Sequence, residues 1–137
     1  TNGAIGYVEL AYAKSNNILY AKLINAAGKT VEATIPSTMA AIKDAKFDDK
    51  LGAIIVNSQH PDAWPIAGFT YLIVNKDYKD CKKAEKLVKF IKWSLTSQAA
   101  MDRASKLLYA PLPTEVMPKV MEAVNKITCN GKPVATP

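Results

Sequence analysis

The sequence has 137 residues, a net charge of +6 and 49% hydrophobic residues. A chain of this length and composition can bury a hydrophobic core as one ordinary domain. Its apolar runs are too short for a membrane-spanning helix, which needs roughly 20 apolar residues, and it has no low-complexity tract or internal repeat. The positive charge favours anionic partners only in a general way.

The first third of the sequence predicts a strand, a short helix and a hairpin. Residues 4–8 are an apolar run with glycines at both ends, which is typical of a buried strand. Residues 10–14 follow as a short helical segment. Residues 20–24 and 29–34 flank an Asn-Ala-Ala-Gly sequence, whose Asn and Gly suit a hairpin turn.

The middle of the sequence predicts a helix and two further strands. Pro36 is well placed in the first turn of a helix that ends near Lys46. Residues 51–56 are a strand candidate, and residues 58–62 are a polar loop. Residues 69–74 are apolar on both faces, the pattern of a central strand covered by helices on both sides.

Three helices are predicted in the C-terminal half. The clearest covers residues 82–95, with one apolar stripe and lysines on the opposite face; the stripe is formed by Ala84, Leu87, Val88, Ile91 and Leu95. A second helix opens at Ser97, and Thr114 can cap a last one. Asn130 and Gly131 predict a turn, with a tail at 132–137. The order of elements predicts an α/β chain.

No motif in the sequence predicts catalysis or metal binding. Ser58, His60 and Asp62 follow one another at alternate positions of a loop, which gives no nucleophile–base geometry. The paired carboxylates Asp48 and Asp49 are adjacent, so their side chains point apart. There is one histidine and no Cys/His cluster. We therefore expect a protein that is not an enzyme and that carries no cofactor.

The lysine-rich segment 76–92 is the strongest charge feature. Phe90 and Trp93 fall on the lysine face of the predicted helix rather than in its apolar stripe. A basic face interleaved with aromatic residues can bind nucleic acid. Alternatively, Trp93 packs beneath a neighbouring element with lysine stems over it.

Three stretches of the sequence resemble bacterial periplasmic phosphate-binding proteins, the substrate-binding components of phosphate ABC transporters. The first is GAIGYVE at 3–9, followed by AYAK at 11–14 and two asparagines at 16–17. The second is DAWPI at 62–66. The third combines Phe90 and Trp93 with YAPLP at 109–113 and GKP at 131–133. The resemblance runs through nearly the whole chain in the same order.

The resemblance implies a two-lobed fold, with mixed sheets flanked by helices, that binds phosphate between the lobes and delivers it to a membrane permease. Residues 1–66 would be the end of the second lobe. Residues 67–137 would be the C-terminal segment that returns to the first lobe, with the crossover between Trp64 and Phe69. The shared Phe and Trp favour packing over nucleic-acid binding, and we expect no nucleic-acid partner.

The phosphate ligands of this family come chiefly from the sequence that precedes the GAIGYVE stretch. We therefore expect the ligand-binding residues upstream of Thr1 and assign none within the chain; Arg103, the only arginine, is not nominated. Because Thr1 is not an initiator Met and a strand pattern begins at once, we expect that the chain was cut from a longer one.

The two cysteines, Cys81 and Cys129, lack CxxC spacing, so by themselves they either pair or remain free. The expected periplasmic location is oxidising, and each cysteine adjoins the end of a predicted helix. We therefore predict a disulfide between them.

The resulting hypothesis is capture of inorganic phosphate for an ABC importer, as part of a longer protein. The alternatives are a fragment or paralogue that acts through protein–protein contacts without ligand, or a binder of a related oxyanion. As a fragment, the chain would leave the 69–74 strand without neighbours. We therefore expect it to pair with a second copy, to swap elements, or to lie beside the missing N-terminal half.

Overall fold

The computed structural model describes residues 3–134. Within that range the chain forms five helices and five two-residue strands, in the order α1 (Leu10–Ser15), β1 (Leu23–Ile24), β2 (Thr30–Val31), α2 (Ile35–Ile42), β3 (Asp77–Tyr78), α3 (Cys81–Thr96), α4 (Gln98–Lys106), α5 (Met117–Asn125), β4 (Thr128–Cys129) and β5 (Lys132–Pro133). The predicted mixture of helix and strand is confirmed.

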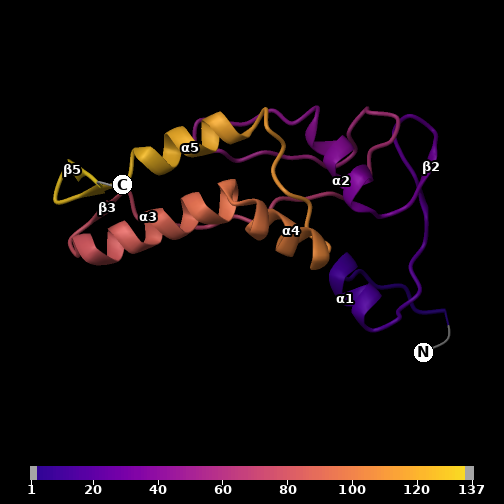
Figure 1. The fold of residues 1–137 in the computed structure, drawn as a ribbon. Helices are drawn as coiled ribbons and strands as arrows, with labels where there is room; N and C mark the ends of the chain where they lie inside the picture. The colour runs from indigo at the N-terminus through magenta and orange to yellow at the C-terminus, as the bar shows by residue number, and fades with distance from the viewer. Residues whose placement is uncertain (1–2, 135–137) are drawn as a thin grey trace.

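The elements form an elongated arrangement (Figure 1). At one end α3 and α5 lie side by side, with β3, β4 and β5 beyond them. Toward the other end lie α2 and the β1–β2 hairpin, and α1 lies near the N-terminus. The long stretch between α2 and β3 runs as irregular chain, and its only strand pairing is an isolated bridge between Val56 and Ile66.

The predicted hairpin at 20–34 is confirmed as an antiparallel pair in which Leu23 faces Val31. Its turn is organised by the buried side chain of Asn25. The Oδ1 atom accepts from the amides of Ala27 and Lys29, while Nδ2 donates to the Pro61 carbonyl at 2.8 Å. Asn25 therefore shapes the turn and also ties it to the loop at 57–62.

The start of α2 agrees with the sequence, but its end does not. Thr34 and Ser37 form a capping box, in which the Ser37 amide donates to Thr34 Oγ1, and Pro36 occupies the first turn. The helix ends at Ile42 rather than near Lys46. The prediction of a strand at 51–56 is wrong, because only the Val56 bridge pairs there.

The long helix predicted at 82–95 is confirmed as α3. Asp80 caps it by accepting from the Lys83 amide, and Ala84, Val88 and Ile91 of the predicted stripe are buried. The last helix begins later than predicted. Thr114 does not cap it; α5 starts at Met117 with no side-chain cap.

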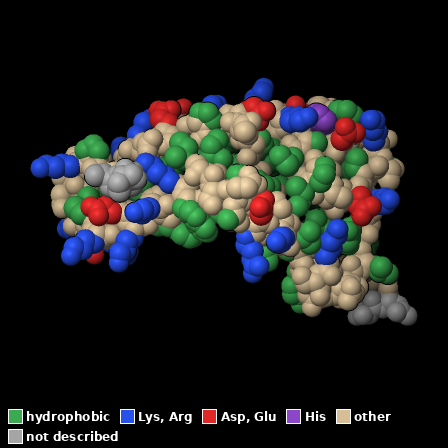
Figure 2. Space-filling model, viewed as in Figure 1, with side chains coloured by type: hydrophobic (Ala, Val, Ile, Leu, Met, Phe, Trp, Pro, Cys, Tyr) green, Lys and Arg blue, Asp and Glu red, His purple; other side chains and the backbone are tan. Residues whose placement is uncertain are grey.

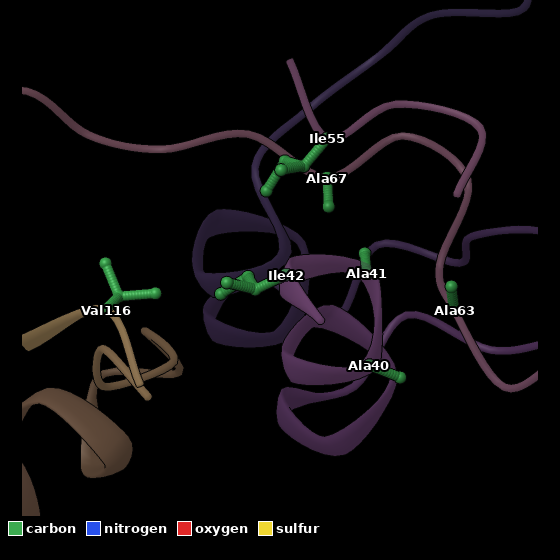
Figure 3. Close-up of a cluster of buried hydrophobic side chains, with 7 residues drawn as sticks. All are labelled: Ala40, Ala41, Ile42, Ile55, Ala63, Ala67 and Val116. Atoms are coloured by element: carbon green, nitrogen blue, oxygen red, sulfur yellow. The ribbon is translucent and has the colours of Figure 1, made fainter. Parts of the chain in front are cut away.

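Two small hydrophobic clusters form the core. The first is built largely from alanines around α2, and Figure 3 shows Ile42 extending toward Val116; its buried members are Ala40, Ala41, Ile42, Ile55, Ala63, Ala67 and Val116. The second joins α3 to α5 and contains Val88, Ile91, Val124 and Ile127. Val120 packs against both clusters, so α5 connects them.

A small sheet and a disulfide lie next to the second cluster, and we call them the C-terminal clasp. The clasp consists of β3, β4, β5 and the disulfide between Cys81 and Cys129. In it β3 pairs parallel to β4, and β4 pairs antiparallel to β5. The disulfide links residues 48 positions apart, with Cα atoms 5.4 Å apart. The predicted turn at 130–131 is confirmed, since both residues have positive φ. The tail prediction is wrong for Lys132 and Pro133, which form β5; residues 135–137 lie outside the described range.

Two further predicted strands are absent, and both segments carry exposed apolar side chains. Ile5 in the 4–8 segment is 98% exposed, and Ile73 in the 69–74 segment is 94% exposed. Neither segment is assigned to a strand. A strand exists only when a neighbour satisfies its backbone groups, and no other part of residues 3–134 lies alongside to do so. The expectation that 69–74 lacks neighbours and exposes apolar surface is confirmed.

Candidate functional site

The loop that contains Ser58 and His60 is organised around a carboxylate that the sequence did not single out. The Oδ2 atom of Asp44 accepts from the Ser58 hydroxyl at 2.7 Å and from the His60 amide at 3.1 Å. The Nδ1 atom of the His60 ring accepts from the Asp62 amide at 3.2 Å. The Ser58 hydroxyl is thus committed to Asp44 and not to the imidazole. The group braces a loop and provides no activated nucleophile.

Asp48, the first residue of the acidic pair at 48–49, has a structural role. Asp48 Oδ1 accepts from the amides of Lys50 and Gly52 at 2.8 and 2.7 Å. This is the local bonding pattern by which aspartate stabilises a turn. A Cβ atom at Gly52 would lie 2.7 Å from the Asp48 carboxylate, so the glycine allows the carboxylate to approach. No group of three metal-ligating side chains occurs among residues 3–134.

Among residues 3–134, two cationic side chains share a hollow: Lys43 and Lys119 line one of about 290 Å³ together with Glu115. Arg103 is exposed on α4. Figure 2 shows Lys and Arg side chains gathered around the end of the molecule that holds the clasp and the start of α3. Phe90 and Trp93 are 57% and 52% exposed on α3, with ring centroids 6.2 Å apart. Both aromatic residues lie on the lysine face, as the helical pattern predicted.

One contact joins the first and third stretches that carry the family resemblance. The phenol of Tyr109 donates to the carboxylate of Glu9, and this hydrogen bond is the largest cause of the raised Tyr109 pKa. Both residues line a hollow of about 510 Å³, together with Trp64 and Thr70. No Lys or Arg lines it. A pocket with a carboxylate and no cation repels a phosphate oxyanion.

An apolar hollow lies beside the 69–74 segment. The hollow, of about 230 Å³, is bordered on one side by the segment and on the other by α3 and α5. Its lining includes Phe69, Leu72, Ile91, Leu95, Val120 and Val124. The wall is therefore formed by residues of the second cluster and by a segment whose own apolar side chains reach solvent. Such a surface fits association with another polypeptide better than catalysis.

The loop residues Ser58, His60 and Asp62, which the sequence analysis considered, are held by hydrogen bonds to Asp44 and to one another and form no triad. The sequence-based expectation that no ligand residue can be assigned here stays a prediction. No helix within residues 3–134 has the length and hydropathy that crossing a bilayer requires. The other notable features are exposed surfaces. They are the apolar segments 4–8 and 69–74 and the lysine face of α3.

Comparison with known proteins confirms the resemblance seen in the sequence. The chain is 34% identical to the phosphate-binding protein PstS of Xylella fastidiosa (strain 9a5c) over 120 residues, which are 86% of this chain and 32% of the relative. It is 34% identical to the protein of the same name from Haemophilus influenzae over 116 residues, which are 83% of this chain and 34% of the relative. The chain thus spans about a third of the length of these relatives.

A weaker similarity links the chain to a putative serine/threonine-protein kinase/receptor of Acanthamoeba polyphaga mimivirus, at 25% identity over 134 residues. The match covers 94% of this chain and 8% of the viral protein. So small a share does not carry a kinase function to this chain. No protein-family model matches the sequence.

Proposed function

We propose that this chain is the part of a phosphate-binding protein that follows its ligand-binding residues, and that the intact protein captures inorganic phosphate for an ABC importer. The observation that carries the proposal is the similarity to two named phosphate-binding proteins over 83–86% of the chain. In that protein the chain serves as scaffold and hinge, and the captured phosphate passes to a membrane permease from the periplasm.

The phosphate ligands lie in the part of the protein that corresponds to the remaining two thirds of the relatives. Two features of this chain support that location. The hollow nearest the shared motifs contains Glu9 and no cationic side chain. Arg103 and four lysines of α3, namely Lys82, Lys83, Lys86 and Lys89, are exposed at ordinary helix positions, where charged side chains are hydrated rather than aimed at a ligand.

The chain contributes to both lobes, with residues 1–66 in the second and residues 67–137 in the first. The two clusters support this division. The first draws five of its seven buried members from residues 40–63, and the second draws all of its buried members from residues 88–127. The exceptions, Ala67, Val116 and the Glu9–Tyr109 hydrogen bond, are contacts between the two parts. They are placed to hold the lobes together where the chain crosses.

The test restores the missing part. This chain replaces the matched region of the Haemophilus influenzae relative, which gives one joined protein, and phosphate is titrated into it by calorimetry with sulfate as control. The joined protein is expected to bind phosphate in preference to sulfate. A folded joined protein that binds neither anion, while the unaltered relative binds phosphate, contradicts the proposal.

A further inference from the structure

One side of α3 carries positive charge and exposed aromatic rings together. Placed at about 100° per residue, a set of basic and aromatic residues falls within roughly 120° of the helix circumference. All of them are exposed, and they form the lysine face of α3: Lys82, Lys83, Lys86, Lys89, Phe90 and Trp93. Glu85, the only acidic residue of α3, lies at the border of this face.

The lysines of this face form no ion pair with an acidic side chain among residues 3–134. The ion pairs in that range belong to Lys22, Lys29 and Lys126. The four ammonium groups of the face therefore add to one positive potential, at the end of the molecule where Figure 2 shows basic side chains gathered. Charge complementarity selects an anionic partner.

The face is formed before any partner arrives, because the opposite side of α3 is packed in the core. Ala84, Val88 and Ile91 are buried there. The helix start is fixed by the cap from Asp80 and by the disulfide to β4. The lysines and rings are thus presented on a folded helix, and binding costs no helix-forming entropy.

The mixture of residues fits an anionic bilayer better than a protein surface. An interface that buried four lysines would need an acceptor for each of them, since an unpaired buried charge is costly. At a bilayer the ammonium groups reach lipid phosphates and water, while their stems lie along the apolar boundary. The rings of Phe90 and Trp93, 57% and 52% exposed, suit the headgroup layer, where aromatic side chains with a polar edge are enriched.

We propose that the lysine face of α3 binds the surface of a bilayer that contains anionic phospholipids, with Phe90 and Trp93 seated in the headgroup layer. The inference rests on the proposed function for the presence of a bilayer, since that function passes phosphate to a membrane permease. The contact concentrates the binding protein at the membrane that holds the permease.

The test measures co-sedimentation of this chain, and of the joined protein described above, with lipid vesicles. One set contains equal parts of phosphatidylglycerol and phosphatidylcholine, and the other contains phosphatidylcholine alone. Both proteins are expected to bind the anionic vesicles and to be released as salt rises from about 0.1 to 1 M, because the Debye length falls from about 10 to 3 Å. Equal binding to the two sets overturns the proposal. So does a joined protein that binds neither, which would show the face to be covered.

A matched pair of triple variants separates the face from net charge. The first removes three lysines of the face: Lys82→Gln, Lys86→Gln and Lys89→Gln. The control removes the same charge from exposed positions elsewhere: Lys14→Gln, Lys50→Gln and Lys106→Gln. The first should weaken vesicle binding roughly 100-fold, because each lysine near an anionic surface contributes about fivefold. The control should weaken it about threefold or less. Equal losses contradict a specific face.

The aromatic contact has its own measurement in this chain. With Trp64→Phe, Trp93 is the only tryptophan, and its fluorescence is expected to shift to shorter wavelength on the anionic vesicles. Phe90→Ser should weaken vesicle binding roughly tenfold through the loss of apolar contact. Tyr7→Ser, which removes another exposed ring, is the control and should leave binding unchanged. An unshifted Trp93 emission in the bound protein contradicts the seating of the rings.

The inference and the proposed function can fail separately. Binding of anionic vesicles by a joined protein that takes up no phosphate would support the lysine face and remove the function. Phosphate binding by a joined protein that ignores anionic vesicles would do the reverse. Binding of duplex DNA without binding of vesicles, lost in the first triple variant, overturns the proposal in favour of nucleic acid.

Discussion

The 69–74 segment has residues that favour strands but no strand partner, whereas the C-terminal clasp has residues that disfavour strands and yet forms a sheet. The segment is rich in the aromatic and β-branched residues that favour strands, yet it is unpaired. The clasp uses Asp77, Lys132 and Pro133, which disfavour strands, yet these residues lie in a three-stranded sheet. The difference teaches that a strand forms where a neighbour is available, and that propensity cannot supply a missing neighbour.

The strands of the clasp can pair because all three of them lie within this chain. The Thr128 hydroxyl and the Gly131 amide donate to Asp77 Oδ1 at 2.6 and 2.9 Å. The disulfide joins the start of α3 to β4. Local turns and one covalent link thus compensate for weak strand sequences. The predictions below compare this self-sufficient region with the incomplete one.

The largest difference is expected between two isoleucines. Ile91→Ala should lower the free energy of unfolding of this chain by about 2–4 kcal/mol, because a buried aliphatic side chain is lost and a cavity remains. Ile73→Ala should change it by about 0.5 kcal/mol or less, because the side chain is 94% exposed. Urea denaturation measures both. Equal costs would show that 69–74 is already covered in this chain.

The disulfide is expected to contribute a similar amount. The double variant Cys81→Ser with Cys129→Ser should lose about 2–4 kcal/mol, since the link closes a long loop of the unfolded chain. The unaltered chain under reducing conditions serves as the control and should lose as much. Intact mass after alkylation without reduction checks the pairing itself: two alkylated thiols in the native protein would refute it.

Whether an element of the fold could be predicted from the sequence depends on whether it is determined by neighbouring residues or by contacts with distant ones. The hairpin around Asn25, the start of α2 and the apolar stripe of α3 are encoded locally, in turn residues, a cap and a helical period, and they were predicted. The strands at 4–8, 51–56 and 69–74 were predicted wrongly, because within residues 3–134 they find no strand partner beyond the single Val56–Ile66 bridge.

The remaining errors concern contacts between residues far apart in sequence. Asp44 reaches the loop of Ser58 and His60, and β3 pairs with β4 across about fifty residues. No local pattern encodes either contact. The absence of an assignable ligand residue, in contrast, followed from the family resemblance and from the lack of any convergent motif, and it remains a prediction.

A smaller effect is expected at the turn between β4 and β5. Gly131 has a φ of 74° and open space where a Cβ would lie, so Gly131→Ala should cost about 1 kcal/mol through backbone strain alone. Gly68→Ala is the matched control, because it also has open space but no positive φ, and it should be neutral or slightly stabilising. Thermal unfolding of both variants measures the difference.

The smallest effect is a pH dependence located in the clasp. Hydrogen bonds from the Thr128 hydroxyl and then from the Gly131 amide lower the pKa of Asp77. Because the folded pKa lies below the unfolded one, the associated stability is present above the ordinary aspartate pKa of about 3.9 and is lost as the pH falls below it. Asp77→Asn should flatten the acid limb of a plot of unfolding free energy against pH, and Thr128→Val should flatten it partly. An unchanged slope in Asp77→Asn would contradict this role.

The central claim is that these residues form the incomplete scaffold of a phosphate-binding protein, with the ligand site elsewhere in that protein. Calorimetric titration of this chain alone with phosphate, and with sulfate as control, tests it most directly. The account predicts no saturable heat for either anion. Tight, phosphate-selective binding by this chain would place the ligands within these 137 residues and contradict the account.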